Sequence, residues 1–499
     1  MKRIIAVLLI FSLLCGLAGC ATEKKPESPG AESRRESSTP AESASVSSMT
    51  VTEPGGYAHR EPVFHDWDGT DTLYPYAVIA HPGLLPFAFE RGALITTETQ
   101  LHYLDFSSGQ VLPFCFRPNC RHDTEDCNAK TSKRTDSFMA NNKLYFLDLS
   151  SVRAVYDEEL KVYAGEIDLY VSSLSGSDEK KIASLRMDMM LDQNSRQLLS
   201  TMAPFISTLV LYGDSAFLFY NLVRKSYGDG GPDDPENNYG HCYVTEINLK
   251  TDKAVRTETL NTGYNPQVEP VCAYGGGIYL WRWQFDEPIL TSLSTETVYY
   301  EGKLMSVDEY FDAIQDLMVE SCVRYDIVTG EMAQRDDLYP DEYDGPLVDH
   351  WDGTIRPLPE FGLLRDWCII NDGDIKAYHL ATGEVRTLYE DLPEKDKTDF
   401  RNQPGIRQVG VGTMIQIFVP TDEGSLSILY DFETDESHVL GNTFDESGAE
   451  IWISDILGRN GNLLYGWAVR AEDNVVIGYG SFDISDGYDK LRFEMMLPV

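Results

Sequence analysis

Positive charge is scarce in this chain of 499 residues. Lys and Arg together total 41 against 80 Asp and Glu, which gives a formal net charge of −39 at pH 7. A surface this negative repels phosphate backbones, so the composition excludes a nucleic-acid-binding protein. It equally disfavours docking on an anionic membrane through a basic patch.

The sequence also lacks the short signatures of common catalytic sites. It contains no G-x-S-x-G elbow, no H-E-x-x-H and no G-x-x-x-x-G-K-[ST] loop. Gly410 and Gly412 have no third glycine partner and precede a strand-like segment, which excludes a dinucleotide-binding turn. Acidic side chains are too numerous to single out a pair for acid–base chemistry. We therefore assign no catalytic residue from the sequence.

Long apolar runs are confined to the amino terminus. A Lys-Arg pair precedes an almost unbroken apolar run over residues 4–14, which is too short to span a membrane and has the form of a signal peptide. Leu-Ala-Gly-Cys follows at 17–20 and resembles the lipobox of bacterial lipoproteins. We predict a lipoprotein signal peptide at 1–19 and lipidation of Cys20. The alternative is an ordinary secretory signal that contains a cysteine.

Residues 21–56 contain no aromatic side chain and consist largely of Ser, Glu, Pro, Ala and Thr. Such a segment buries too little surface to offset its ordering entropy, so we predict that 20–56 is the lipidated cysteine followed by a disordered tether. About 36 flexible residues reach roughly 30–35 Å. We expect an extracytoplasmic protein anchored to the cell membrane by lipid. Removal of the signal deletes Lys2 and Arg3, which takes the net charge from −39 to −41.

From residue 57 onward, short β-rich segments alternate with turn residues. Seven times, a strand of alternating polarity leads into a turn with Ser, Thr, Gly or Asp and then into another strand. The turn centres lie near residues 108, 176, 251, 329, 382, 434 and 486, and the last three intervals are all close to 52 residues. A period near 50 is typical of four-stranded propeller blades, and radial closure hides sheet edges.

The repeat therefore predicts an all-β fold. We expect a single β-propeller domain over 57–499 with about seven four-stranded blades, one more or one fewer being compatible with the spacing. Two β-sandwich domains are the alternative. Two matching segments at 65–70 and 349–354 predict equivalent loops in two blades, whose Trp packs between blades; a duplicated ligand site is the alternative interpretation.

A small helical insertion interrupts the repeats. Ser306 and Glu309 form an S-x-x-E capping box, which predicts a helix starting there. The apolar face of that helix is expected to hold Tyr310, Phe311, Ile314, Leu317 and Met318. A second short helix is expected near 187–202. We expect both helices to cover blade edges.

Nine cysteines occur, of which Cys15 leaves with the signal and Cys20 is the lipidation site. A lone cysteine in an apolar strand is usually a small buried hydrophobe. We expect this of Cys242, Cys272, Cys322 and Cys368.

The other three cysteines lie close to a histidine in the pattern C-x4-C-x-H-x4-C. The residues are Cys115, Cys120, His122 and Cys127. Three thiolates and one imidazole form a closed tetrahedral set suited to a structural Zn²⁺ ion. A disulfide among the three cysteines is the competing hypothesis for an exported chain. A redox-active thiol pair beside His122 is a third.

The lipobox, the tether and a first repeat that ends in this cluster, followed by Asn128-Ala129, resemble a group of propeller-like surface lipoproteins from anaerobic Gram-positive gut bacteria. The resemblance covers the architecture of the whole chain, although only the cluster is specific. It implies the fold and the cell-surface location, and it implies no activity.

The expected architecture favours a binding or scaffold module for a protein, peptide or glycan. Propellers offer a concave central face, and 28 Tyr, 21 Phe and 7 Trp leave some rings for stacking. We expect a monomer. The alternative is an extracellular glycoside hydrolase or lyase. Carboxylates or a histidine converging at the centre of the ring would favour the enzyme, and a plugged centre would favour the scaffold.

Overall fold

The computed structural model describes residues 73–80, 87–187, 206–223, 239–287, 297–334 and 347–498, with gaps inside the second and the last two of these ranges. The predicted signal peptide and tether, the matching segments at 65–70 and 350–354, and the helix expected near 187–202 beyond its first residue lie outside them. Within the described ranges, no helix has the length and apolar character needed to cross a membrane.

The fold is all-β, as the sequence predicts, and its strands pair antiparallel, mostly in chain order. We name the four-stranded units by their order in the chain. Unit 1 contains β2 (Phe87–Phe89), β3 (Gly92–Thr96), β4 (Leu101–Asp105) and β5 (Gln110–Pro113). After a 3-10 turn, η2 (Thr131–Lys133), unit 2 contains β6 (Arg134–Ala140), β7 (Lys143–Asp157), β8 (Val162–Ser173) and β9 (Lys180–Met187).

An eight-stranded sheet follows. It contains β1 (Tyr74–Ala80), β10 (Thr208–Gly213), β11 (Ser215–Val223), β12 (Tyr239–Asn248), β13 (Lys253–Tyr274), β14 (Gly277–Phe285), β17 (Met318–Asp326) and β18 (Met332–Gln334). The first half of β13 pairs with β12 and the second half with β14, and the two ladders meet at Tyr264. Unit 3 is therefore β10 to the first half of β13, and unit 4 is the second half of β13 to β18.

Three further sheets of four or five strands form units 5 to 7. Unit 5 contains β21 (Leu363–Leu364), β22 (Trp367–Asn371), β23 (Ile375–His379) and β24 (Val385–Tyr389). Unit 6 contains β25 (Gly405–Val409), β26 (Met414–Thr421), β27 (Gly424–Asp431) and β28 (Glu436–Leu440). Unit 7 contains β30 (Glu450–Asn460), β31 (Leu463–Arg470), β32 (Val476–Asp483) and β33 (Arg492–Pro498), with β29 (Thr443–Phe444) at its edge. Two small hairpins are β15 (Thr297–Tyr300) with β16 (Lys303–Ser306), and β19 (Leu347–Asp349) with β20 (Ile355–Pro357).

All seven predicted hairpins are present, and each joins the last two strands of a unit. In most of them the strand before the turn ends in Asp or Asn, whose side-chain oxygen accepts backbone N–H groups of the turn. This holds for Asp105, Asn248, Asp326, Asp431 and Asp483. Local side-chain acceptors of this kind stabilise turns without any tertiary contact.

The residue after this acceptor is apolar and packs into the preceding unit. Leu249 joins the core of unit 2, Phe432 that of unit 5 and Ile484 that of unit 6. Phe106 of unit 1 packs instead against Leu457 and other residues of unit 7. The same turn position thus links successive units and also joins the first unit to the last.

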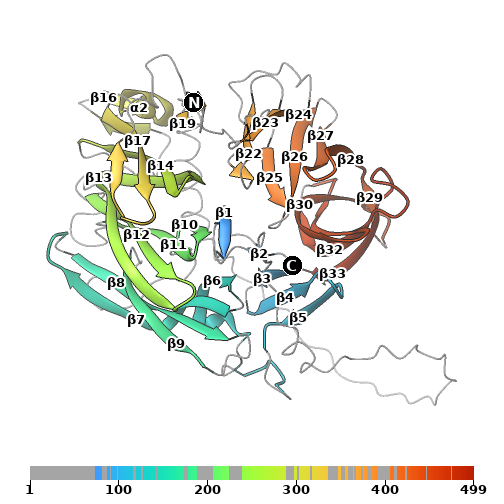
Figure 1. Ribbon diagram of the computed structural model, residues 1–499, viewed down its shortest axis with the longest axis horizontal. Helices are drawn as coiled ribbons and strands as arrows, with labels where there is room; N and C mark the ends of the chain where they lie inside the picture. Colours follow the sequence, from blue (N-terminus) through green and yellow to red (C-terminus); the bar gives the residue numbers. More distant parts are fainter. Residues whose placement is uncertain are drawn as a thin grey trace, which may run out of the picture.

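The units follow one another around a ring in sequence order, so that the blue first sheet lies beside the red last one (Figure 1). Among the strands that the structure describes, none of unit 1 pairs with one of unit 7. Side chains join them: the Tyr465 hydroxyl donates to the Phe106 carbonyl oxygen at 3.1 Å, and the Asn460 amide donates to the Ser107 carbonyl oxygen at 3.3 Å. The Phe106 and Tyr465 rings stack with centroids 5.3 Å apart.

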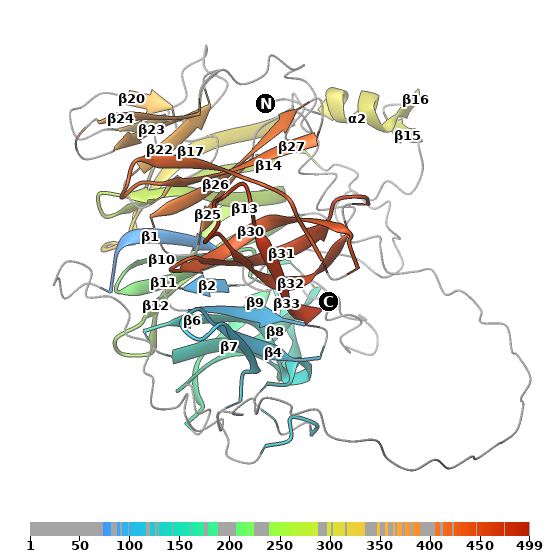
Figure 2. The same ribbon diagram turned by 90° about the vertical axis from the view of Figure 1, so that its right-hand side faces the viewer.

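Strand β1 lies inside the ring, near its centre (Figure 1), and beside β10 and β11 in the perpendicular view (Figure 2). It pairs with β10, from Tyr74 opposite Gly213 to Ala80 opposite Leu209, and it also contacts β13 and β21. Tyr74 and Val78 are 2% and 6% exposed. The chain thus fills part of its own ring centre with an apolar strand.

The predicted helix is present as α2 (Val307–Ile314), and its capping box is confirmed. The Ser306 hydroxyl lies 3.0 Å from a Glu309 carboxylate oxygen, and the Glu309 N–H donates to Ser306 Oγ at 3.2 Å. Tyr310 and Ile314 pack with Phe285 at the end of β14. The helix is shorter than predicted: it ends at Ile314, and Met318, expected on its apolar face, is the first residue of β17 because it pairs with Phe285.

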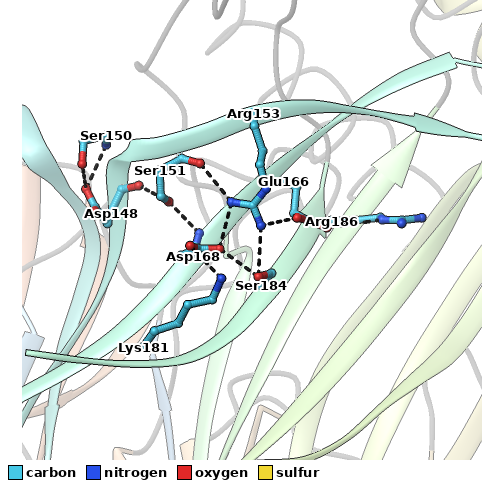
Figure 3. Close-up of polar contacts among 9 residues, drawn as sticks. All are labelled: Asp148, Ser150, Ser151, Arg153, Glu166, Asp168, Lys181, Ser184 and Arg186. Carbon is cyan, nitrogen blue, oxygen red and sulfur yellow. Dashed lines mark hydrogen bonds and ion pairs between the residues drawn. The ribbon is translucent and has the colours of Figure 1, made fainter.

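Unit 2 carries a polar network on its long strands (Figure 3). Strand β7 bulges between Asp148 and Arg153, where its pairing with β8 shifts register. Asp168 of β8 accepts from Arg153 at 3.0 Å and from the Ser184 hydroxyl at 2.8 Å, and it pairs with Lys181 at 2.8 Å. Burial favours the neutral form of Asp168, but these donors outweigh it and lower its pKa. Arg153, Lys181 and Arg186 thus each have a carboxylate partner. The network stabilises the bulge of β7.

Candidate metal centre

The predicted cysteine–histidine cluster lies on the connection between β5 and β6, where unit 1 passes into unit 2. Cys115 comes two residues after the end of β5. The far end of the connection is fixed by backbone hydrogen bonds to the start of β4 and the residue before it: Leu101 N–H donates to the Ala129 carbonyl oxygen at 2.7 Å, and Gln100 pairs with Lys130. The connection is therefore attached to unit 1 on both sides of the cluster.

The structure brings all four predicted ligands together. One donor atom from each of Cys115, Cys120, His122 and Cys127 lies within 4.8 Å of every other. Cys115 and Cys127 are 3% and 5% exposed, whereas Cys120 and His122 are partly exposed. His122 has a positive φ of 58°, a conformation uncommon outside glycine, which turns the chain back between Cys120 and Cys127.

Cys127 is the central thiol of the cluster. Its sulfur accepts from the Ala129 N–H at 3.4 Å and lies 3.4 Å from Nδ1 of His122. Burial raises the pKa of the Cys127 thiol to about 12; the Ala129 N–H opposes this, and hydrogen bonds with the thiols of Cys120 and Cys115 add to it. The metal-free Cys127 thiol therefore keeps its proton, and a cation has to displace that proton to bind there.

The donor set fits a tetrahedral metal ion. With zinc–sulfur bonds of about 2.3 Å, the sulfurs of a tetrahedral site lie about 3.8 Å apart. Donor atoms already within 4.8 Å of one another need only small side-chain adjustments to reach that geometry. The three cysteines are reduced in the structure, with no disulfide joining them. Spacing alone thus predicted which residues converge, and the geometry is compatible with a metal ion.

Two neighbours of the cluster carry no signal in the sequence pattern. The Gln100 side-chain amide donates to the His122 carbonyl oxygen at 3.1 Å and so holds the strained residue in place. Burial lowers the pKa of His102; a backbone hydrogen bond at Gln100 opposes this, and the nearby charge of His122 lowers it further. Both residues come from the β3–β4 side of unit 1, which no local motif connects to the cluster.

The single cysteines behave as predicted where their side chains are described. Cys242 and Cys322 are 1% and 0% exposed. Burial raises the pKa of the Cys242 thiol far above its ordinary value, so this sulfur stays protonated and unreactive. Cys272 and Cys368 lie on β13 and β22.

No protein-family model matches the sequence, and no curated protein is found as a relative. Among solved structures, the β-propeller domain of the Trilobed protease from Pyrococcus furiosus is similar with 8% identity, 85% of this chain and 96% of that chain covered, and a TM-score of 0.36. The Pyrococcus horikoshii acylaminoacyl peptidase is similar with 9% identity and a TM-score of 0.38. The match covers 85% of this chain and 52% of the peptidase. An oligogalacturonate lyase in complex with manganese shows 9% identity over 69% and 75%, with a TM-score of 0.30. Similarities this low carry no argument about function.

Proposed function

We propose that this chain is a lipid-anchored, extracytoplasmic binding module built on a seven-bladed β-propeller. Each of the seven four-stranded units is one blade in this proposal. Their order around the ring, the recurring outer turn and the packing of Phe106 against unit 7 support it. Antiparallel sheets arranged radially also protect edges that would be exposed if the sheets stood apart.

The placement of β1 carries the choice of a binding module over an enzyme. In the enzyme alternative, the substrate enters the centre of the ring and meets converging acids or bases there. Here β1 lies near that centre and turns Tyr74, Ala77 and Val78 into the apolar cores of the surrounding units. An apolar strand in this position supports a scaffold whose ligand, a protein, peptide or glycan, is bound on the outer surface.

The location follows from the amino terminus. In the proposal, residues 1–19 are removed, Cys20 carries the lipid and the segment to residue 56 is the tether. The lipobox and the resemblance to propeller-like surface lipoproteins support this assignment. A Cys20→Ser variant should then be released from the membrane fraction, whereas a control Cys15→Ser variant should stay with it. Equal membrane association of both variants would contradict lipidation at Cys20.

The metal of the cluster is proposed to be zinc. Cys115, Cys120, His122 and Cys127 would hold the ion, and its chemistry there would be structural, because four protein ligands leave no open position. The ion would fix the connection between units 1 and 2. Metal analysis should find one zinc per chain, and Cys127→Ala should lose it while Cys242→Ala keeps it. Wild-type protein without stoichiometric metal would refute the assignment.

Binding is tested by capturing partners from the native envelope with the lipidated protein, alongside a glycan array. A reproducible partner or glycan supports the binding module. As a control, the same protein is incubated with the glycans and the products are analysed. Depolymerisation of a glycan would instead favour the glycoside hydrolase or lyase.

A further inference from the structure

The three thiols of the cluster differ in their access to solvent and in their contacts. Cys120 is partly exposed, whereas Cys115 and Cys127 are 3% and 5% exposed. Cys127 contacts the thiols of both other cysteines, and all three sulfurs lie within 4.8 Å. One thiol is therefore reachable by a solute, and a second, buried thiol lies directly beside it.

A disulfide is within reach of this arrangement. An S–S bond of about 2.05 Å requires two sulfurs to approach from their present separation, which rotation about short side-chain bonds achieves when the backbone is permissive. Between Cys120 and Cys127, His122 turns the chain with its positive φ of 58°, and the Cys127 N–H donates to the Thr124 carbonyl oxygen at 3.0 Å. This turn already brings the two cysteines together.

We propose that Cys120 and Cys127 form a thiol pair that an extracellular low-molecular-weight disulfide oxidises, and that this oxidation expels the metal ion. Only the expulsion of the metal ion rests on the proposed metal centre; the formation of the disulfide does not. Cys120 sulfur attacks one sulfur of the small disulfide and displaces its first thiol. Cys127 sulfur then attacks Cys120 sulfur and displaces the second.

The step is balanced in atoms and electrons. Cys120 and Cys127 lose two electrons and form one S–S bond, while the small disulfide gains two electrons and becomes two thiols. The two protons of the cysteines, or the positive charge of the departing ion, accompany the leaving thiolates. Only Cys115 and His122 remain as donors, and two donors do not hold zinc in a closed site. Metal binding and the bridge are thus mutually exclusive.

The experiment treats full-length protein, zinc-loaded or stripped with a chelator, with oxidised glutathione. A chromogenic chelator follows released zinc, and peptide mass mapping locates the bridge. We expect one Cys120–Cys127 bridge per chain in both the stripped and the zinc-loaded protein, and one zinc ion released per bridge from the loaded form. Cys242 and Cys322, both buried, serve as internal controls and should stay unmodified.

A matched pair of variants separates the thiol pair from general loss of the metal site. Cys115→Ser and Cys127→Ser each remove one buried ligand, but only Cys127→Ser removes the proposed partner of Cys120. We expect the bridge in Cys115→Ser and none in Cys127→Ser. A Cys115–Cys120 bridge in Cys127→Ser at the wild-type yield, or oxidation of the wild type without any bridge, would overturn the proposal.

The outcomes also separate this inference from the metal centre. If stripped protein forms the bridge but no preparation binds metal, the metal centre fails and the thiol pair stands. If zinc binds stoichiometrically but oxidation yields no Cys120–Cys127 bridge, the thiol pair fails and the metal centre stands.

Discussion

At the scale of single residues, one acceptor recurs through the chain. An Asp or Asn ends the strand before most of the outer turns, and its oxygen accepts the N–H groups that the turn leaves unpaired. Asp326 is the best described case, with N–H donors from Val328 and Thr329 at 3.0 and 2.9 Å. The Thr329 N–H, with help from Arg324, lowers the pKa of Asp326 to about 2.

Asp326 should make folding stability depend on acid. Because its pKa is lower in the folded chain than in the unfolded one, its contribution is present above about pH 4 and is lost as the pH falls toward about 2. The Asn oxygen in Asp326→Asn still accepts from the turn but does not titrate. Between about pH 5 and about pH 2, wild type should lose about 1 kcal/mol more stability than the variant, a value reduced for partial solvent screening. Parallel denaturation curves at each pH measure it, and equal losses would contradict the assignment.

The junction of units 1 and 7 depends on a residue without a side chain. A Cβ added to Gly458 would lie 2.1 Å from Cε2 of Phe106, which is 3% exposed. We expect Gly458→Ala to destabilise by about 1–3 kcal/mol through overpacking. Phe106→Leu should relieve the clash, so the double variant should lose less than the sum of the two single losses. Strictly additive losses in thermal unfolding would show that the two residues do not meet.

The sequence identified those residues of the site that act through local spacing. The outer turns and the four cluster ligands were predictable because Asp, Gly, Cys and His at short intervals leave few local conformations. Gln100 and His102 were not predictable, because they reach the cluster only through the pairing of the β3–β4 loop with residues 129–131. No local sequence pattern predicts that pairing.

At the scale of elements, units are held to one another through the carbonyls of their outer turns. Arg256 of unit 3 donates to the Ile327 carbonyl oxygen at 2.6 Å. Arg386 of unit 5 donates to the Phe432 carbonyl oxygen at 2.8 Å. In unit 2 the Asn141 amide donates to the Leu249 carbonyl oxygen at 3.0 Å. Each donor lies in the unit before the turn, so hydrogen bonds and apolar packing connect the same pairs of units.

The capping box of α2 should control that helix locally. Ser306→Ala removes the acceptor for the Glu309 N–H, and the loss of such a cap costs about 1 kcal/mol. We expect faster hydrogen exchange over 307–314 and little change in exchange elsewhere. Ser306→Thr keeps the hydroxyl and should exchange like the wild type. Unchanged exchange in Ser306→Ala would show that packing against Phe285 alone holds the helix.

The sequence pattern did not predict the continuity of β13. Its middle contains Gly263, Asn265, Pro266 and Pro270, which are turn formers and favour a break between two strands. The structure accommodates them within one strand by shifting register between Tyr264 and Gln267 and again near Pro270. Asn265 takes a positive φ of 46° at the first shift. Pairing on both sides, which is not local, overrides the local preference.

At the scale of the whole molecule, β1 links the centre of the ring to several units. Its place could not be predicted, because its partner β10 lies about 130 residues further along the chain. Tyr74 and Val78 belong to the core shared with units 1, 2 and 3, and Ala77 to the core of units 3 and 4. One short strand therefore supports much of the first half of the ring.

A charge at the centre should destabilise the entire fold. Val78 is 6% exposed and pairs with Leu211, so Val78→Asp places a carboxylate without a partner in the core. We expect a loss of roughly 3 kcal/mol or more in the free energy of unfolding. Val255 is 54% exposed, and Val255→Asp adds the same charge with a change within about 0.5 kcal/mol. Equal midpoints in denaturant for the two variants would contradict the placement of β1.

Strand β13 also limits where recombination can divide the gene without splitting a sheet. Between most units the connection leaves each sheet complete, so recombination there adds or removes one whole repeat. A breakpoint inside β13 leaves either β12 or β14 without its neighbour. We therefore expect units 3 and 4 to be exchanged, duplicated or lost only as a pair, because they share one strand.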